Sequence, residues 1–172
     1  MLSLRNDPDF FKIFSGIKFG VEKEAIRINP KTGELAQTTH PKKLGSALTN
    51  KRITTDFSES LMEFVTKPHD SIMGAIKEIR EIETFTAQHL DNEVLWPLSM
   101  PCKLPDDDSN IRLADYGKSH LGQLKKVYRR GLGYRYGRQM QMIAGMHFNI
   151  SFPEAFWQNI YGQVSSTTSP RK

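Results

Sequence analysis

The stretch FGVEKEAIRINP, residues 19–30, decides the fold because it has the pattern of a strand with two carboxylates on one face. Side chains alternate between the two faces of a strand, so Glu22 and Glu24 point the same way. Like charges on one face repel each other, and glutamate is a poor strand former. Two interpretations explain the pattern: a solvated face that Lys23 and Arg27 neutralise, or a bound cation. The stretch by itself favours the solvated face, because such faces are common.

Length and composition indicate one soluble globular domain. The chain has 172 residues, of which 38% are hydrophobic and 25% charged. No stretch approaches the roughly 20 apolar residues that span a membrane, so we expect no membrane association. Asp7 and Asp9 lie where a secretory signal would keep an apolar run, and the single Cys102 cannot form an internal disulfide. These features predict a reduced, cytoplasmic protein.

The net charge of +5 is unevenly distributed along the chain. Residues 116–153 hold seven Lys and Arg side chains and no acidic one, so the remainder is mildly acidic. An acidic segment followed by a basic one suits a site for metal ions and phosphates. It also suits nucleic-acid binding, which stays open as an alternative.

Periodicity along the chain predicts strands and helices in alternation. Apolar alternation predicts four strands, over residues 17–29, 53–55, 61–66 and 145–152. Apolar residues at three- and four-residue steps predict a helix from an Asp70 N-cap to about Leu90. Further helical segments are expected at 44–48, at 121–132 with Ser119 as the cap, and at 135–142. The fold class is therefore α+β with an antiparallel or mixed sheet packed with helices, and the sheet is small for this length.

Several polar side chains lie within apolar strand patterns. Glu63 shares its strand face with Leu61 and Val65, and a carboxylate among aliphatic side chains must be paired, hydrogen-bonded or bound to metal. A salt bridge to an arginine, or an edge strand that faces water, explains it equally well. His147 lies in the middle of an apolar strand, where a histidine is more often a core residue than a ligand. Asn149 adds a second polar group on the same face.

Carboxylates with one imidazole form an oxygen-rich set, which suits Mg²⁺ with substrate phosphates that complete its shell. The Cys and His spacing is not that of a zinc site. The chain has neither GxxxxGK[ST] nor GxGxxG, which argues against a P-loop or Rossmann nucleotide site. In the basic segment LKKVYRRGLGYRYGRQ, Arg129 and Arg130 could grip a carboxylate or phosphate. A solvated helix with half-buried tyrosines is the alternative that the residues alone slightly favour.

Four segments together resemble one family. The four segments are FGVEKEAIRINP, HPKKLGSALTNKRITTDFSESLMEFVT, LWPLSMPC and YRRGLGYRYGRQMQMIAGMHFNISFP. In this order, they are similar to the N-terminal part of proteobacterial glutamate–cysteine ligase. The resemblance runs from about residue 16 to 161. It implies a glutamine-synthetase-like ligase fold, here incomplete. It also implies ATP- and Mg²⁺-dependent joining of the γ-carboxyl of L-glutamate to L-cysteine through an acyl phosphate, the first step of glutathione biosynthesis.

The resemblance also implies roles for individual residues. The expected Mg²⁺ ligands are Glu22, Glu24, Asp56, Glu63 and His147. The expected cysteine-pocket residues are Phe57, Tyr128 and Leu132, and those near the glutamate substrate are Gln141 and Asn149. Arg129 is expected to face a substrate carboxylate or phosphate as a catalytic residue. The nucleotide-binding residues are not identified.

The chain departs from the family in length, because family members are much longer. We expect residues 1–162 to form the N-terminal portion of the catalytic domain and residues 163–172 to form a disordered polar tail. The expected partners are L-glutamate, L-cysteine, ATP and a missing C-terminal half or second subunit, so the chain alone should have little or no ligase activity. The alternatives are a non-catalytic fragment or a subunit of a split ligase and, ranked last because the acidic set opposes it, a basic nucleic-acid-binding module formed by residues 116–138.

Overall fold

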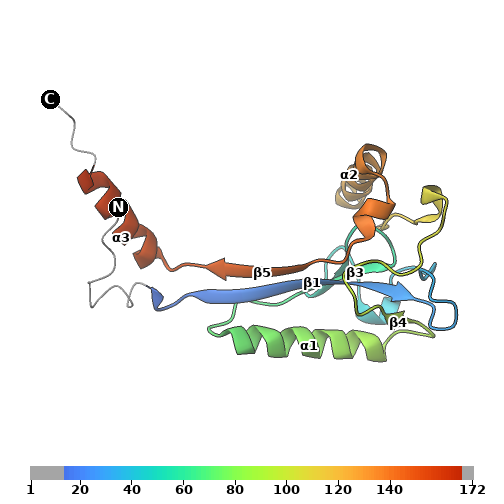
Figure 1. Cartoon of the computed structure of the whole chain (residues 1–172), viewed down its shortest axis with the longest axis horizontal. Coiled ribbons are helices and arrows are strands. Elements are labelled where there is room, and N and C mark those ends of the chain that lie inside the picture. Colours follow the sequence, from blue (N-terminus) through green and yellow to red (C-terminus); the bar gives the residue numbers. More distant parts are fainter. Residues whose placement is uncertain (1–13, 168–172) are drawn as a thin grey trace.

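A long central strand, β1, organises the molecule (Figure 1). The computed structural model describes residues 14–167, and the side chains of residues 14–161. The described strands are β1 (Lys18–Ile28), β2 (Ile53–Thr55), β3 (Leu61–Val65), β4 (Val94–Leu95) and β5 (Met146–Ser151). Their order is β2-β3-β1-β4, and β5 also pairs with β1. All of these strand pairs are antiparallel, which confirms the predicted sheet type and the four predicted strands.

Helices and short 3₁₀ turns complete the described part of the chain. The helices are α1 (Ile72–Gln88), α2 (His120–Tyr136) and α3 (Glu154–Thr167). The 3₁₀ turns are η2 (Lys42–Leu44), η3 (Asp108–Asn110) and η4 (Gln139–Met142). The helical turn predicted at 44–48 therefore lies slightly earlier in the chain. Among the described helices, none combines the length and the apolar character that a bilayer crossing requires.

Helix α1 begins one residue later than the sequence predicts. Ser71 is the N-cap, and its Oγ accepts the backbone N–H of Gly74 at 3.1 Å. Asp70, the predicted cap, pairs instead with Lys18. The cap prediction was wrong because a serine hydroxyl and an aspartate are equally suitable caps, and the competing lysine comes from a distant segment.

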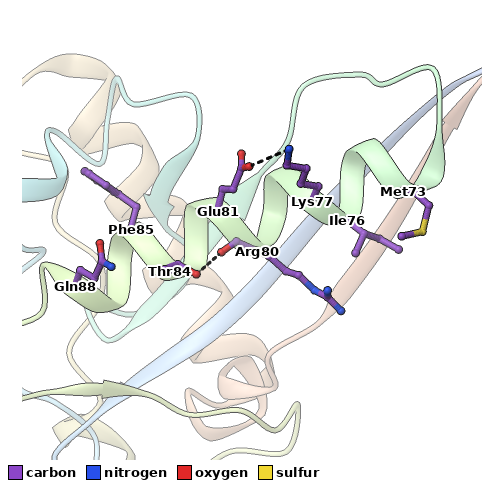
Figure 2. A pocket seen from close by; sticks show the side chains of 8 residues that line it. All are labelled: Met73, Ile76, Lys77, Arg80, Glu81, Thr84, Phe85 and Gln88. Atoms are coloured by element: carbon purple, nitrogen blue, oxygen red, sulfur yellow. Dashed lines mark hydrogen bonds and ion pairs between the residues drawn. The ribbon is translucent and has the colours of Figure 1, made fainter.

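The two sides of α1 differ in their surroundings. Its inner side packs Ala75 and Ile79 against Val21 and other apolar side chains of the sheet. Its outer side carries an open groove of about 640 Å³, which Figure 2 shows to be lined by side chains of α1 alone. Met73, at one end of this groove, is exposed. The groove thus lies on the solvent side of the helix.

Helix α2 is one helix where the sequence predicts two. It runs through Gly131 and Gly133 to Tyr136, and Gly137 ends it with a φ of 80°. The predicted break at Gly133 was wrong because an internal glycine weakens a helix by only about 1 kcal/mol and does not by itself end it. A Cβ there would lie 3.2 Å from Arg138 Cγ, which is tight, and 3.6 Å from Phe57 Cζ, which is an ordinary contact. The segment after Gly137 forms the 3₁₀ turn η4.

The C-terminal helix α3 was not predicted. The Phe152 ring stacks on Phe156 with centroids 4.4 Å apart, and both contact Trp157. Helix α3 continues to Thr167, so the first part of the tail expected to be disordered is helical. The rest of the tail, and residues 1–13 of the N-terminal segment, lie outside the described residues.

Apolar side chains cover both faces of the sheet around the middle of β1. On the α1 side the buried cluster includes Val21, Ala25 and Phe64. On the opposite side Ile26, Leu61 and Phe57 pack with residues of the later loops, and Leu132 of α2 packs against them. Successive side chains of β1 thus belong to two separate cores, one on each face of the sheet.

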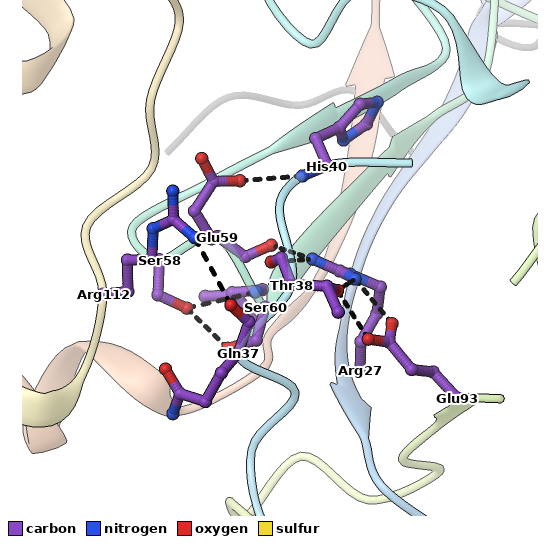
Figure 3. A network of polar contacts seen from close by, with 10 residues as sticks. Arg27, Gln37, Thr38, His40, Ser58, Glu59, Ser60, Glu93 and Arg112 are labelled. Carbon is purple, nitrogen blue, oxygen red and sulfur yellow. Dashed lines mark hydrogen bonds and ion pairs between the residues drawn. The ribbon is translucent and has the colours of Figure 1, made fainter. Parts of the chain in front are cut away.

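A buried arginine ties the end of β1 to three loops (Figure 3). Arg27 is fully buried, and its Nη1 lies 2.5 Å from Glu93 Oε2 and 2.6 Å from Thr38 Oγ1. Its Nη2 donates to the carbonyl of Glu59 at 2.7 Å. A buried charge needs such partners, and here they come from segments far apart in the sequence.

Candidate functional site

Five polar side chains gather on the sheet face opposite α1. Strand register places Glu24 opposite Glu63 and Glu22 opposite His147. Residues paired directly across antiparallel strands point to the same face, and this is the face of Ile26 and Leu61. Asp56 follows β2, two residues after Thr54, which lies opposite Glu63. We call this set the acidic face; its members are Glu22, Glu24, Asp56, Glu63 and His147.

Burial and electrostatic repulsion together raise the pKa of Glu63, at the centre of the acidic face. Burial, followed by the charges of Asp56, Glu24 and Glu22, raises the pKa of Glu63 to about 7. Arg129 opposes this shift but does not cancel it. Near neutral pH the carboxyl of Glu63 therefore carries a proton about half of the time. The shift shows that these carboxylates lie close enough to repel, which scattered surface acids would not do.

Glu24 is held in place by the backbone before β5. Burial is the main cause that raises the pKa of Glu24, and a hydrogen bond from the Gly145 N–H, at 2.6 Å to Oε2, opposes it. The Asp56 and Glu22 charges raise the pKa further, whereas His147 lowers it. The role of Gly145 was not predicted from the sequence. Its position as the first residue of the predicted strand that carries His147 was the available signal.

His147 lies at the open side of the acidic face. Its Nδ1 is 3.3 Å from Glu22 Oε2, and 62% of its side chain is exposed. The interpretation of His147 as a core residue is therefore wrong. An exposed imidazole next to a carboxylate is available to a ligand or a metal ion.

Asp56 is fixed by groups from α2 and from the segment before it. Arg129 Nε donates to the Asp56 carbonyl, and its Nη2 lies 3.6 Å from Asp56 Oδ1. Tyr116 donates its hydroxyl to the carbonyls of Thr55 at 2.5 Å and Asp56 at 3.1 Å. The guanidinium also lies over the Tyr116 ring, 4.8 Å from its centroid. Arg129 therefore holds Asp56, and its expected contact with a substrate carboxylate or phosphate stays a prediction. The role of Tyr116 was not predicted from the sequence, because no local pattern links it to Asp56.

The residues expected to contact substrates lie in different environments. Phe57 is buried in the core on the acidic side, and Leu132 packs against that core. Tyr128, also on α2, is exposed, and Gln141 lies half-buried in η4. Asn149 is exposed on β5 and lines, with Glu22, a cavity of about 240 Å³. Of the five, Asn149 is thus placed beside a member of the acidic face.

Three larger hollows lie away from the acidic face. The groove of about 640 Å³ lies on the outer side of α1. A second cavity, of about 400 Å³, is lined by His40, Glu59 and neighbouring loop residues. A third, of about 310 Å³, is lined by loop residues that include Glu34 and Lys103. None of the three contains a predicted metal ligand. The chemistry of this molecule is therefore indicated by the charges on the acidic face rather than by the size of a hollow.

The acidic face fits a hard divalent cation in its chemistry but not as a closed cage. Within the part of the chain that the structure describes, no three His, Cys, Asp or Glu side chains stand together at metal-binding distances. Mg²⁺ usually takes one or two protein carboxylates, with water and substrate phosphates as its other ligands. A cation would also relieve the repulsion that, after burial, raises the pKa of Glu63. The donor set therefore suits an open Mg²⁺ site.

Comparison with known proteins relates the chain to one family. The family model described as glutamate-cysteine ligase matches residues 2–172, and so extends past the point where the sequence resemblance was expected to end. A glutamate–cysteine ligase of Saccharophagus degradans is 50% identical over 154 residues, which are 90% of this chain and 29% of the relative. A glutamate–cysteine ligase of Alcanivorax borkumensis is 50% identical over 152 residues, 88% of this chain and 29% of that relative.

Solved structures show the same relation. The glutamate–cysteine ligase of Francisella tularensis in complex with AMP matches with a TM-score of 0.82 and 43% identity, over 87% of this chain and 30% of that one. A bifunctional glutathione synthetase from Pasteurella multocida matches with a TM-score of 0.78 and 28% identity, over 92% of this chain and 20% of that one. The chain thus spans less than a third of the length of these relatives.

Proposed function

Because the chain belongs to the glutamate–cysteine ligase family, we propose that it is the metal-binding part of an ATP- and Mg²⁺-dependent ligase that joins L-glutamate to L-cysteine. One observation carries this proposal: Glu22, Glu24, Glu63 and His147 share one sheet face. Burial and the charges of the neighbouring carboxylates, Asp56 included, raise the pKa of Glu63 to about 7. The proposed role in the cell is the first step of glutathione synthesis, in the reduced cytoplasm. Cys102, which is free and buried, suits that compartment.

The proposed reaction has two steps. An oxygen of the glutamate γ-carboxylate attacks the γ-phosphorus of ATP and displaces ADP, which gives an acyl phosphate. The cysteine nitrogen then attacks the acyl carbon, the phosphate leaves, and the nitrogen loses a proton to form the amide. Mg²⁺, when bound, neutralises the charge that collects on the phosphoryl oxygens during the transfer.

The side chains of the acidic face would hold the metal. The proposed ligands are Glu22, Glu24, Asp56, Glu63 and His147. The Gly145 N–H fixes one carboxylate, that of Glu24. Arg129 and Tyr116 fix the Asp56 segment through its backbone carbonyl. Such outer contacts orient ligands before the metal arrives, and their loss usually lowers metal affinity.

The proposed substrate contacts lie around this set. Asn149 shares a cavity with Glu22, which supports a contact with the glutamate substrate. Gln141 is assigned to the same substrate from the family resemblance. Tyr128 and Leu132 lie on α2, and Leu132 packs on the same core as Phe57, which supports one cysteine pocket formed by the three residues.

The chain spans 29% of the relatives that it matches, so we propose that ligation requires additional polypeptide. The test is a chimaera in which this chain replaces the matched part of the Saccharophagus degradans ligase. We expect ATP-dependent formation of γ-glutamylcysteine by the chimaera and none by the chain alone. A folded but inactive chimaera contradicts the proposal.

A substitution that removes one carboxylate tests the metal site in the same chimaera. Glu63→Gln should raise the Mg²⁺ concentration for half-maximal activity by about tenfold or more, because it removes a ligand. Mn²⁺ titration of the isolated chain, followed by electron paramagnetic resonance, should show the same loss of affinity. Glu81→Gln on the outer side of α1 is the matched control, since that carboxylate is exposed and far from the acidic face. An unchanged metal dependence would remove Glu63 from the site.

A further inference from the structure

Gly145, directly before β5, has a backbone conformation that does not require glycine. Its φ lies outside the left-handed region, in contrast to that of Gly137. An alanine can adopt such a backbone, and the exchange of glycine for alanine then normally stabilises a protein slightly. The space around Gly145 therefore decides whether a side chain is accepted there.

Two of the proposed metal ligands border that space. A Cβ built on Gly145 would lie 3.2 Å from His147 Nε2, which is tight, and 3.5 Å from Glu24 Oε2, which is an ordinary contact. The carboxylate belongs to β1 and the imidazole to β5. Donor atoms from two strands thus converge on one point beside the Gly145 Cα, and the missing side chain leaves that point open.

The imidazole presents its unprotonated nitrogen to the same point. His147 Nδ1 lies 3.3 Å from Glu22 Oε2, within hydrogen-bond distance. Because a carboxylate accepts hydrogen bonds and does not donate them, Nδ1 carries the ring proton and Nε2 keeps its lone pair. Metal-bound histidines usually have this arrangement. The atom that a side chain at position 145 would press against is therefore the atom available to a metal ion.

The backbone at Gly145 is held on both sides, whereas the imidazole is not. The Glu24 N–H donates to the Gly145 carbonyl at 2.9 Å, and the Gly145 N–H donates to Glu24 Oε2 at 2.6 Å. The preceding Ala144 is buried, and its N–H donates to the Ser99 carbonyl at 2.9 Å. His147 is exposed and can turn into solvent. An added methyl group would therefore displace the imidazole rather than the backbone.

We propose that Gly145 is a positioning residue of the metal site, because its missing side chain lets His147 Nε2 and Glu24 Oε2 serve one cation together. Any larger residue at this position separates the two donors. The role depends on the proposed function, since it requires both side chains to be metal ligands. It goes further in one respect: a substitution that leaves every ligand in place should still weaken metal binding.

Mn²⁺ titration of the chain, followed by electron paramagnetic resonance, tests this role without any need for ligase activity. Gly145→Ala should weaken Mn²⁺ binding by about tenfold or more, as is usual when a residue that orients metal ligands is changed. The thermal denaturation midpoint of the metal-free chain should stay within about 4 °C, because the exposed imidazole can move. Gly131→Ala is the matched control, since a Cβ on that residue of α2 would meet nothing within 4 Å.

A double-variant cycle shows whether the effect passes through the imidazole. His147→Ala alone should also weaken Mn²⁺ binding. In that background Gly145→Ala should cause less than about a threefold further loss, because the ring that the methyl group displaces is absent. In the metal-free chain, the nuclear magnetic resonance shifts of the His147 ring protons should change in Gly145→Ala and stay unchanged in Gly131→Ala.

The outcomes separate this role from the proposed function. If the unsubstituted chain binds Mn²⁺ and Gly145→Ala binds it equally well, the role of Gly145 is overturned and the metal site stands. The same holds if Gly131→Ala loses as much affinity, if Gly145→Ala loses affinity only together with its fold, or if its loss persists in full in the His147→Ala background. If the unsubstituted chain binds no Mn²⁺, the proposed metal site and the role of Gly145 are overturned together.

Discussion

At the scale of single residues, Glu63 shows how a strand position becomes a functional candidate. Its side chain lies between apolar neighbours on its own strand and carboxylates on the adjacent segments. Alternation along β3 and β1 is local, so the sequence predicted which side chains share a face. It did not predict that Glu24 lies opposite Glu63, because strand register depends on contacts between distant segments.

The raised pKa of Glu63 predicts a pH-dependent loss of stability. In the unfolded chain the carboxyl loses its proton near its ordinary pKa of 4.5, whereas in the folded chain it keeps the proton to about pH 7. The folded state therefore binds more protons between these values, and the metal-free chain loses stability as the pH rises from about 4.5 to about 7. Urea denaturation midpoints across this range measure the effect. Glu63→Gln should flatten the profile there, and Glu81→Gln should not.

The hydroxyl of Tyr116 is expected to matter for both stability and metal binding. Tyr116→Phe removes the donor to the carbonyls of Thr55 and Asp56, and should cost about 1–3 kcal/mol because these groups are partly buried. The Mn²⁺ affinity of the isolated chain should fall as well, since the Asp56 segment loses one of its restraints. Tyr134→Phe is the control because Tyr134 is almost fully exposed. A stability loss without any change in Mn²⁺ affinity would assign Tyr116 a structural role only.

At the scale of elements, the two glycines of α2 separate helix propensity from packing. A Cβ at Gly131 would meet nothing within 4 Å, so Gly131→Ala should raise stability by about 0.5–1 kcal/mol. A Cβ at Gly133 would lie 3.2 Å from Arg138 Cγ and 3.6 Å from Phe57 Cζ, so the same change there should bring no gain or a loss. Thermal denaturation of the two variants measures the difference. Equal gains would show that Gly133 has no packing role.

The same glycines explain which elements the sequence could predict. Four of the five described strands follow an apolar alternation that a short window contains, and they were predicted within about one residue of their ends. The two-residue strand β4 was not predicted. The break predicted at Gly133 was wrong because an internal glycine costs a helix only about 1 kcal/mol relative to alanine and does not by itself end it. The tight neighbour of a Cβ at Gly133 is Arg138 Cγ, at 3.2 Å, and no periodicity reveals it. Helix α3 was missed because its stability draws on the rings of Phe152, Phe156 and Trp157, which do not form a regular apolar stripe.

At the scale of the whole molecule, the exposed β5 explains why the sheet looked small for the chain length. The sequence predicted that this strand has one polar and one apolar face, and both faces are present as expected. It could not predict that the apolar face lies in solvent, because burial depends on which elements pack nearby. The proposed metal site also depends on contacts between distant segments. Its ligands come from segments more than 100 residues apart, and only folding brings them together.

Arg27 bonds to three loops, and its removal should destabilise all three together. Arg27→Met leaves the carboxylate of Glu93 and the carbonyl of Glu59 without their buried donor, which should cost about 3–5 kcal/mol. That is a large share of the roughly 5–15 kcal/mol that stabilises a domain. The urea midpoint should fall sharply, and the double variant Arg27→Met/Glu93→Leu should recover part of the loss because no carboxylate then remains unpaired.

An exposed ion pair provides the control for this effect. Lys43 lies 2.9 Å from Asp91, and both side chains are exposed, so Lys43→Met should leave the urea midpoint almost unchanged. Because Arg27 bonds to three loops at once, its loss should also increase hydrogen exchange in the segments around Thr38, Glu59 and Glu93 together. If only the Glu93 segment responds, the arginine holds one loop and not the molecule. If Lys43→Met shifts the midpoint as far as Arg27→Met does, burial does not account for the strength of the pair.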